Sequence, residues 1–194
     1  MRVIAGTAKG RALKAVPGMN TRPTTDKVKE AIFSMIGPYF EGGWALDLFA
    51  GTGGLGIEAL SRGADHAVFV DLEQSSIDVV KRNVQAAGFT EQAEIYRNES
   101  LRALKALAKR GTAFRIVFLD PPYKIRNMDV MMQSLSGLGL LSHGAVIVVE
   151  HDAGHTYPEA IDGFEQAKHS TYGDTAVTIY YYRHADGSTV QMEE

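Results

Sequence analysis

The sequence has 194 residues, of which 45% are apolar and 22% are charged, and this composition fits one globular domain with a sizeable core. It contains no apolar run of about 18 residues and no apolar leader at its N-terminus, so we expect neither a membrane partner nor secretion. The absence of cysteine excludes disulfide bonds, thiolate metal sites and cysteine nucleophiles. It is also compatible with a cytoplasmic location, which we expect. The sequence does not reveal the oligomeric state, and a monomer is the working expectation.

The charge is distributed unevenly along the chain. The formal net charge is −3, but residues 1–30 carry seven basic and two acidic side chains, whereas the remaining residues carry 13 and 21. A basic segment on an acidic body suggests an anionic partner such as a nucleic acid. A solvated surface segment explains the same asymmetry, and charge alone does not separate the two interpretations.

The N-terminal region predicts a small β-hairpin followed by a helix. Val3–Ala5 and Arg11–Val16 alternate apolar and polar residues around the turn-rich stretch G-T-A-K-G. Thr25 is a suitable N-cap, and apolar residues then recur at helical spacing until Gly37-Pro38 ends the helix. We therefore expect residues 1–20 to form a basic hairpin or arm that is separate from the rest of the chain.

From Trp44 onward the sequence alternates strand-like and helix-like segments, which predicts an α/β fold with a mostly parallel sheet covered by helices on both faces. An antiparallel hairpin is expected at the C-terminal edge of the sheet. The whole of residues 21–194 is treated as one Rossmann-like domain. The expected strands are Ala45–Phe49, Ala67–Asp71, Ala93–Tyr96, Ile116–Asp120, Ala145–Glu150, Ala167–Tyr172 and Ala176–Arg183, and the expected helices are Leu55–Arg62, Ser75–Ala87, Leu101–Arg110 and Met128–Gly137.

A glycine-rich loop joins the first of these strands to the first of these helices. Gly51, Gly53 and Gly56 satisfy the pattern G-x-G-x-x-G between a strand and a helix, where glycine lets a ligand approach the backbone. Asp71 ends the next strand, and a carboxylate there can accept hydrogen bonds from both hydroxyls of a ribose. The loop therefore predicts a nucleoside-containing cofactor.

The glycines alone do not distinguish NAD from S-adenosylmethionine. Asp47, four residues before the first glycine, favours S-adenosylmethionine, because a carboxylate would repel a pyrophosphate but suits an ammonium and a sulfonium.

The sequence V-F-L-D-P-P-Y at residues 117–123 predicts a rigid lip after a strand, because the two prolines cannot continue the sheet ladder. Asp120 and the carbonyl of Pro121 can accept hydrogen bonds from both N–H groups of an exocyclic amine and so localise its lone pair. The Tyr123 ring offers a surface for stacking an extruded base, an interaction of about 1–3 kcal/mol. These residues suit methyl transfer to a nucleobase amine, in which positioning matters more than a strong base.

Taken together, these motifs resemble class I S-adenosylmethionine-dependent methyltransferases, and D-P-P-Y resembles the signature of enzymes that methylate adenine N6, guanine N2 and some glutamine side chains. The ordered stretches R-V-I-A-G-x-x-K-G-R, R-P-T-T-D-K-V-K-E-A-I-F, L-D-L-F-A-G-T-G-G-L-G-I-E-A-L-S-R-G-A and V-F-L-D-P-P-Y resemble the RsmD family of bacterial small-subunit ribosomal RNA guanine-N2 methyltransferases. The resemblance covers nearly the whole chain and is most specific in the first half.

The resemblance implies a role for each residue of the pattern. S-adenosylmethionine is the implied cofactor, without a metal, and the small ribosomal subunit with its 16S rRNA is the implied partner. Glu99 stands where relatives often carry Asp or Asn near the adenine amine. The implied catalytic residues are Asp120, Pro121, Pro122 and Tyr123; the cofactor-binding residues are Asp47, Phe49, Gly51, Thr52, Gly53, Gly56, Asp71, Leu72, Glu99 and Ser100; and the RNA-binding residues are Arg2, Lys9, Arg11, Arg22 and Lys27.

Three alternatives remain open. A DNA or RNA adenine-N6 methyltransferase would share D-P-P-Y, but such DNA enzymes normally carry an additional target-recognition segment for which this chain has no room. A non-catalytic RNA-binding relative would not need the glycine loop, Asp71 and D-P-P-Y together. An NAD-dependent oxidoreductase is disfavoured by Asp47 and by the lack of an evident hydride-transfer residue.

Overall fold

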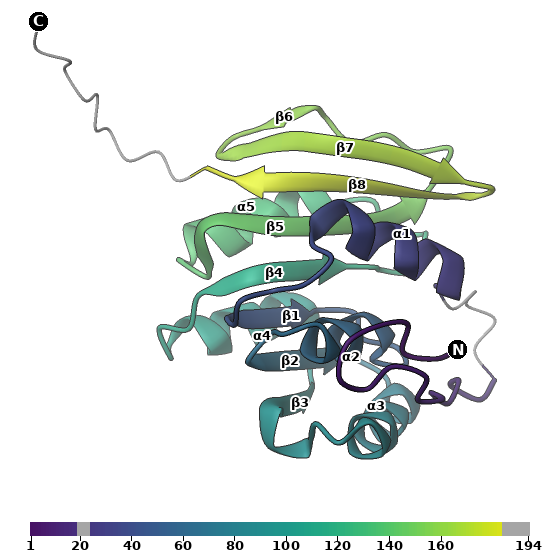
Figure 1. Ribbon diagram of the computed structural model, residues 1–194. Helices are drawn as coiled ribbons and strands as arrows, with labels where there is room; N and C mark the ends of the chain where they lie inside the picture. The colour runs from purple at the N-terminus through teal and green to yellow at the C-terminus, as the bar shows by residue number, and fades with distance from the viewer. Residues whose placement is uncertain (19–23, 184–194) are drawn as a thin grey trace, which may run out of the picture.

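The computed structural model describes residues 1–18 and 24–183. These residues contain one eight-stranded sheet with helices on both faces (Figure 1). The strands are β1 Trp44–Asp47, β2 His66–Asp71, β3 Ala93–Arg97, β4 Phe114–Leu119, β5 Leu141–Asp152, β6 Ala160–Ile161, β7 Phe164–Tyr172 and β8 Thr175–Tyr182. The helices are α1 Asp26–Ile36, α2 Gly54–Ser61, α3 Gln74–Ala87, α4 Ser100–Ala108 and α5 Met128–Gly137, with a 3-10 helix η1 at Thr90–Gln92.

The strand order is β3-β2-β1-β4-β5-β8-β7-β6. β1 to β5 pair with one another in parallel, whereas β8 pairs antiparallel with both β5 and β7, and β7 pairs antiparallel with β6. The chain proceeds outward from β1 in one direction and from β4 in the other, so the carboxyl ends of β1 and β4 flank the point where the strand order reverses. In open α/β sheets, ligands bind in the crevice outside this point.

Alternate residues of each buried strand belong to two separate cores, as the two-residue period of a strand requires. The residues of one parity, among them Phe69, Phe118 and Val148, pack with Ile32 and Phe33 of α1 and with α2 and α3. The other parity, including Val117, packs with α4 and α5 on the opposite face. Figure 1 shows α1, α2 and α3 in front of the sheet and α4 and α5 behind it.

The N-terminal segment lies on the same face as α1 to α3 and is part of the first core. Val3, Ala8 and Leu13 are buried there. Buried Glu58 of α2 accepts hydrogen bonds from the amides of Ile4, at 2.9 Å, and Ala5, at 3.0 Å. The segment therefore docks on the domain. The boundary that we expected after residue 20 lies outside the described residues.

The sequence-based expectations for the fold class are confirmed, with small differences in extent. The five parallel strands and the C-terminal hairpin are present, and α5 has the predicted bounds. Thr25 caps α1, accepting a hydrogen bond from the Val28 amide at 3.2 Å. The N-terminal hairpin is shorter than expected, because only an isolated antiparallel bridge joins Arg2 and Ala12. None of the helices in the described ranges is long and apolar enough to span a membrane.

Candidate active site

Four carboxylates lie at or just beyond the carboxyl ends of adjacent parallel strands. Asp71 and Asp47 end β2 and β1, Asp120 follows β4, and Glu150 lies near the end of β5. Their order follows from the register, in which Asp47 pairs with Phe118 and Leu119 pairs with Val149. All four have the parity of the strand residues that face α1 to α3. The sheet therefore presents a row of acids on one face at its reversal point.

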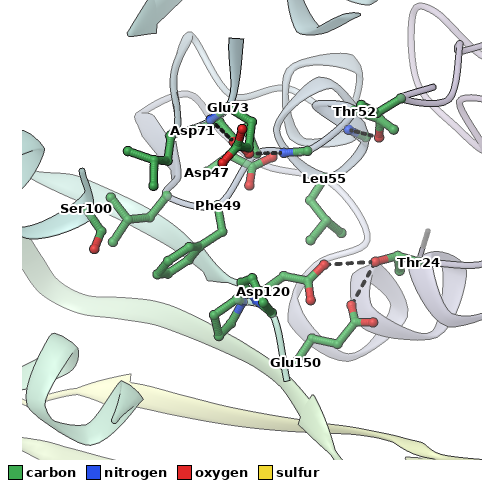
Figure 2. A pocket seen from close by; sticks show the side chains of 18 of the residues that line it. Thr24, Asp47, Phe49, Thr52, Leu55, Asp71, Glu73, Ser100, Asp120 and Glu150 are labelled. Carbon is green, nitrogen blue, oxygen red and sulfur yellow. Dashed lines mark hydrogen bonds between the residues drawn. The ribbon is translucent and has the colours of Figure 1, made fainter. Parts of the chain in front are cut away.

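These acids border a cavity of about 990 Å³, which is large enough for a nucleoside cofactor and part of a second molecule. Besides the four acids, its lining includes Thr24, Phe49, Gly51, Thr52, Leu55, Leu72, Glu73, Asn98, Glu99, Ser100, Pro121, Pro122, Tyr123 and Lys124. Figure 2 shows the ring of Phe49 between the Asp71 end of this cavity and Asp120.

The three patterned glycines have different tasks. Gly51 lies in the left-handed region, with φ of 55°, lines the cavity and has open space where a Cβ would stand. Gly53 precedes α2 with φ of 81°. A Cβ on Gly56 would lie 2.4 Å from a ring carbon of Phe69, so this glycine lets α2 pack closely on β2. The cavity lining includes Gly51 but neither Gly53 nor Gly56.

The carboxylates of Asp47 and Asp71 accept hydrogen bonds from backbone amides of the glycine-rich segment. Buried Asp47 accepts a hydrogen bond from the Gly56 amide at 3.0 Å. Burial raises the pKa of Asp47 to about 7, and the charge of Asp71 adds to the rise. Asp71 accepts from the amides of Gly51, at 2.8 Å, and Glu73, at 2.9 Å. A carboxylate has about four acceptor positions, so Asp71 retains capacity for a ligand.

At the far end of the cavity, the predicted residues Leu72, Glu99 and Ser100 are all present in the lining. Leu72 is 58% exposed, an unusual position for leucine that leaves its side chain open to a ligand. Glu99 is the N-cap of α4 and accepts from the amides of Leu101 and Arg102, both at 3.0 Å, and from the Ser100 hydroxyl. These hydrogen bonds, chiefly that from Leu101, lower the pKa of Glu99. Its oxygens are thus engaged by the helix terminus.

The D-P-P-Y segment forms the opposite wall of the cavity. The Pro122 carbonyl accepts the Ile125 amide at 2.8 Å, which closes a turn. The Pro121 carbonyl receives no hydrogen bond from any residue in ranges 1–18 and 24–183, so it remains available as an acceptor. The Tyr123 hydroxyl lies 2.5 Å from Oγ1 of Thr175, a contact that ties the lip to β8.

Glu150 and Thr24 complete this wall, and the sequence patterns did not single them out as site residues. The Thr24 hydroxyl lies 2.8 Å from Oε2 of Glu150 and 3.3 Å from Oδ2 of Asp120, as Figure 2 shows. Burial, together with the nearby charges of Glu150 and Asp47, raises the pKa of Asp120 well above its usual range. Burial likewise raises the pKa of Glu150 to about 7. A signal for Glu150 existed, because it ends a predicted strand as Asp71 and Asp120 do.

Four of the predicted RNA-binding residues, Arg2, Lys9, Arg11 and Lys27, belong to the N-terminal segment and α1. Lys9, Arg11 and Lys27 are exposed. Arg2 forms an exposed ion pair with Asp26 of α1 at 3.6 Å. Arg22 lies outside the described residues.

Comparisons with known proteins extend these observations. A model of the family described as "Conserved hypothetical protein 95" matches residues 1–181. The chain is 52% identical over 183 residues to "Putative rRNA methyltransferase YlbH" of Bacillus subtilis, covering 94% of this chain and 100% of that protein. It is 31% identical over 189 residues to "Ribosomal RNA small subunit methyltransferase D" of Escherichia coli K12, covering 97% and 93% of the two chains.

Solved structures share the fold. "Putative methyltransferase yhhF from Escherichia coli" superimposes with a TM-score of 0.79 at 31% identity, covering 94% of this chain and 98% of that one. "Crystal structure of SMU.776, a putative methyltransferase complexed with SAH" superimposes with a TM-score of 0.63 at 16% identity over 80% of this chain, a likeness of fold alone.

Proposed function

The chain belongs to the family described as Conserved hypothetical protein 95, the RsmD family, and from this premise we propose that it transfers a methyl group from S-adenosylmethionine to the exocyclic N2 of a guanine in small-subunit ribosomal RNA. The observation that carries the proposal is the pair of open acceptors, Asp120 and the Pro121 carbonyl, on the wall of a cofactor-sized cavity at the reversal point of the sheet.

The residues of the cavity fit S-adenosylmethionine. Asp71 retains acceptor capacity for two ribose hydroxyls, and exposed Leu72 beside it offers an apolar surface to an adenine. Asp47 places a carboxyl group where an amine or a sulfonium would be favoured. On the adenine side, the Glu99 oxygens cap α4 and the Ser100 hydroxyl donates to Glu99. Asn98 uses its Oδ1 to accept the Glu99 amide, so its side-chain NH2 is the group that can donate to the ring.

The bound cofactor supplies an activated methyl group. The protein's own part is to hold the target amine. Asp120 and the Pro121 carbonyl accept one hydrogen bond each from the two N–H groups, which localises the nitrogen lone pair toward the methyl group. The nitrogen becomes acidic once it is methylated and then loses one proton, for which Asp120 is the adjacent acceptor. Preorganised acceptors of this kind act mainly in the transition state and require little reorganisation. The Tyr123 ring, oriented by Thr175, offers the surface on which the extruded base stacks.

Two further features support ribosomal RNA as the substrate. The E. coli relative is named for the small ribosomal subunit, and the B. subtilis relative for rRNA. Lys9, Arg11 and Lys27 are exposed and free to contact phosphates. We further propose guanine 966 of 16S rRNA as the target, a monomeric enzyme, and the cytoplasm as its location.

The test is methyl transfer from labelled S-adenosylmethionine to small subunits that lack the modification, beside free ribosomal RNA and duplex DNA, with the product nucleoside identified by mass spectrometry. We expect N2-methylguanine on the subunit RNA. Asp120→Ala removes the acceptor and should lower kcat by more than about 100-fold while the Kd for S-adenosylhomocysteine changes less than about threefold. N6-methyladenine as the product, or near-normal turnover by Asp120→Ala, would contradict the proposal.

A further inference from the structure

Glu150 is a buried carboxylate whose hydrogen bonding is incomplete. The residue is only 4% exposed, and among the described residues no Lys or Arg forms an ion pair with it. Its Oε2 accepts the Thr24 hydroxyl, and no described donor reaches Oε1. Lys29 borders the same cavity, but its Nζ is engaged by Glu58, at 3.5 Å, and by the Arg2 carbonyl. A buried carboxylate with one neutral donor destabilises the fold, so its position calls for a ligand that completes its bonding.

The contact with Thr24 places Glu150 beside the proposed catalytic acceptors. One hydroxyl has one proton, and the distances of 2.8 Å to Glu150 and 3.3 Å to Asp120 indicate that Glu150 receives it. Because both carboxylates lie within 3.3 Å of the same hydroxyl, Asp120 and Glu150 are close enough to contact neighbouring atoms of one small ring. The register agrees, because Leu119 and Val149, the residues just before them, are direct partners across β4 and β5.

Glu150 also lies on the side from which a substrate can arrive. Together with Thr24 it borders a second groove of about 530 Å³, which runs between the start of α1 and the β7–β8 turn. This groove contains Lys27 and Tyr172 but none of the glycine-loop residues. Glu150 thus faces the substrate side of the cavity and not the predicted cofactor side.

We propose that Glu150 accepts the ring N1–H of the target guanine while Asp120 and the Pro121 carbonyl accept from its 2-amino group, so that Glu150 selects guanine over other bases. In guanine the exocyclic amine is flanked by a ring N–H donor. In adenine and cytosine the amine is flanked by a ring nitrogen acceptor, which an ionised carboxylate repels. This assignment rests on the proposed function and gives its base specificity a structural source.

The acid pair also gives the reaction a pH dependence. Two nearby buried carboxylates do not both ionise readily, and the donors of a guanine edge favour the ionised forms. Since burial raises the pKa of Glu150 to about 7, kcat/KM should rise with pH and level off above about 7. The titratable side chains that line the two cavities together with Glu150 are Asp47, Asp71, Glu73, Glu99, Asp120, Tyr123, Tyr172, Lys27, Lys29 and Lys124.

The experiment compares Glu150→Gln with the wild-type protein on two substrates, small subunits with the natural guanine and subunits with adenine at the same nucleotide. The glutamine has nearly the same shape, and its amide can either accept from guanine N1–H or donate to adenine N1. We expect kcat/KM for the guanine substrate to fall at least about 10-fold, because a neutral amide replaces the charged acceptor of N1–H. The ratio of kcat/KM for guanine to kcat/KM for adenine should also fall at least about 10-fold, because the wild-type site accepts from N1–H of guanine and rejects the acceptor N1 of adenine. The rise of kcat/KM near pH 7 should move to lower pH.

Controls separate this inference from the proposed function. The matched variant Glu165→Gln changes an exposed glutamate of β7 and should behave as the wild type. S-adenosylhomocysteine should bind to Glu150→Gln with a Kd within about threefold of the wild-type value. If wild-type protein methylates the guanine but Glu150→Gln retains its rate, preference and pH profile, the inference is wrong and the proposed function stands. If Glu150→Gln does not fold, a flat wild-type kcat/KM between pH 5.5 and 8.5 overturns the inference without any variant. If wild-type protein produces N6-methyladenine, both fail.

Discussion

Asp47→Asn should stabilise the protein, and the gain should grow with pH. Asp47 is 1% exposed, and in the described structure its carboxylate accepts one hydrogen bond, from Gly56. Burial raises its pKa from 3.8 to about 7, a shift of about 3 units. At about 1.4 kcal/mol per unit, ionising this group in the folded protein costs about 4 kcal/mol more than in the unfolded chain.

The direction follows from proton linkage. Between pH 3.8 and about 7 the folded state binds the Asp47 proton more tightly than the unfolded chain does, so this group's contribution to stability falls as pH rises through that window. Asparagine keeps a carbonyl that can accept the Gly56 amide but carries no charge. The variant should therefore be more stable than wild type by about 2 kcal/mol at pH 5 and by about 4 kcal/mol at pH 8.

The assay is urea unfolding of both proteins at the two pH values, with equal slopes required before the free energies of unfolding are compared. Asp65→Asn is the matched control, because Asp65 also accepts a glycine amide, that of Gly43 at 2.8 Å, but is exposed. Its effect should stay below about 1 kcal/mol at both pH values. An Asp47→Asn gain that is the same at pH 5 and pH 8 would show that the cavity solvates the carboxylate and would refute the reasoning.

Three further predictions follow from the same face of the molecule. Gly56→Ala should destabilise the fold by about 1–3 kcal/mol in urea unfolding, because its Cβ would meet Phe69 at 2.4 Å; an unchanged midpoint would refute this packing role. Replacing Lys9 and Arg11 by glutamine should weaken binding to the small subunit. The slope of the logarithm of the binding constant against the logarithm of the salt concentration should fall by about one to two, which corresponds to the loss of one to two phosphate contacts, whereas an unchanged slope would show that this segment does not contact the RNA. Tyr123→Phe should lower kcat about two- to tenfold without changing cofactor affinity, because the ring loses its hydroxyl anchor to β8, and full activity would show that packing alone orients the ring.

The fold was largely predictable because its signals are local. Apolar strand segments alternate with amphipathic helical ones, and Gly88, in the left-handed conformation, ends α3 as its sequence position indicates. The N-terminal segment was harder to interpret. Its charge suggested a separate arm, but Val3, Ala8 and Leu13 anchor it in the core, and their spacing of five residues matches neither the strand period nor the helix period.

The site was predictable where motif and strand end coincide, and less so where tertiary contacts decide a residue's task. The glycine pattern alone does not distinguish Gly56, which lets α2 pack against Phe69, from Gly51, which lines the cavity. The difference depends on the neighbouring strand β2. Glu99 similarly carries no local sign that its oxygens cap α4. Glu150 ends a predicted strand, but only the order of β4 beside β5 places it next to Asp120.

Glu58 is a buried carboxylate with a structural role, and its contacts differ from those of the acids in the cavity. Fully buried in α2, it contacts two cations, Lys29 at 3.5 Å and Arg62 at 2.8 Å, and accepts the amides of Ile4 and Ala5. Such a group is satisfied by its surroundings and links α1, α2 and the N-terminal segment.

The carboxylates on the cavity wall have fewer hydrogen-bond donors around them than Glu58 has. Within residues 1–18 and 24–183, buried Asp47 and Glu150 each accept one hydrogen bond, from a neutral donor. In the same ranges Asp120 has only the longer contact with the hydroxyl that Glu150 already engages. Because Glu58 on the same face of the sheet is satisfied, a buried acid in this chain does not have to lack partners. These three acids lie on the cavity wall, where their unused acceptors can be met by the donors and the positive charge of a ligand. The stability that Asp47→Asn is expected to recover is, on this view, the measure of what an incompletely bonded carboxylate on the cavity wall costs the fold.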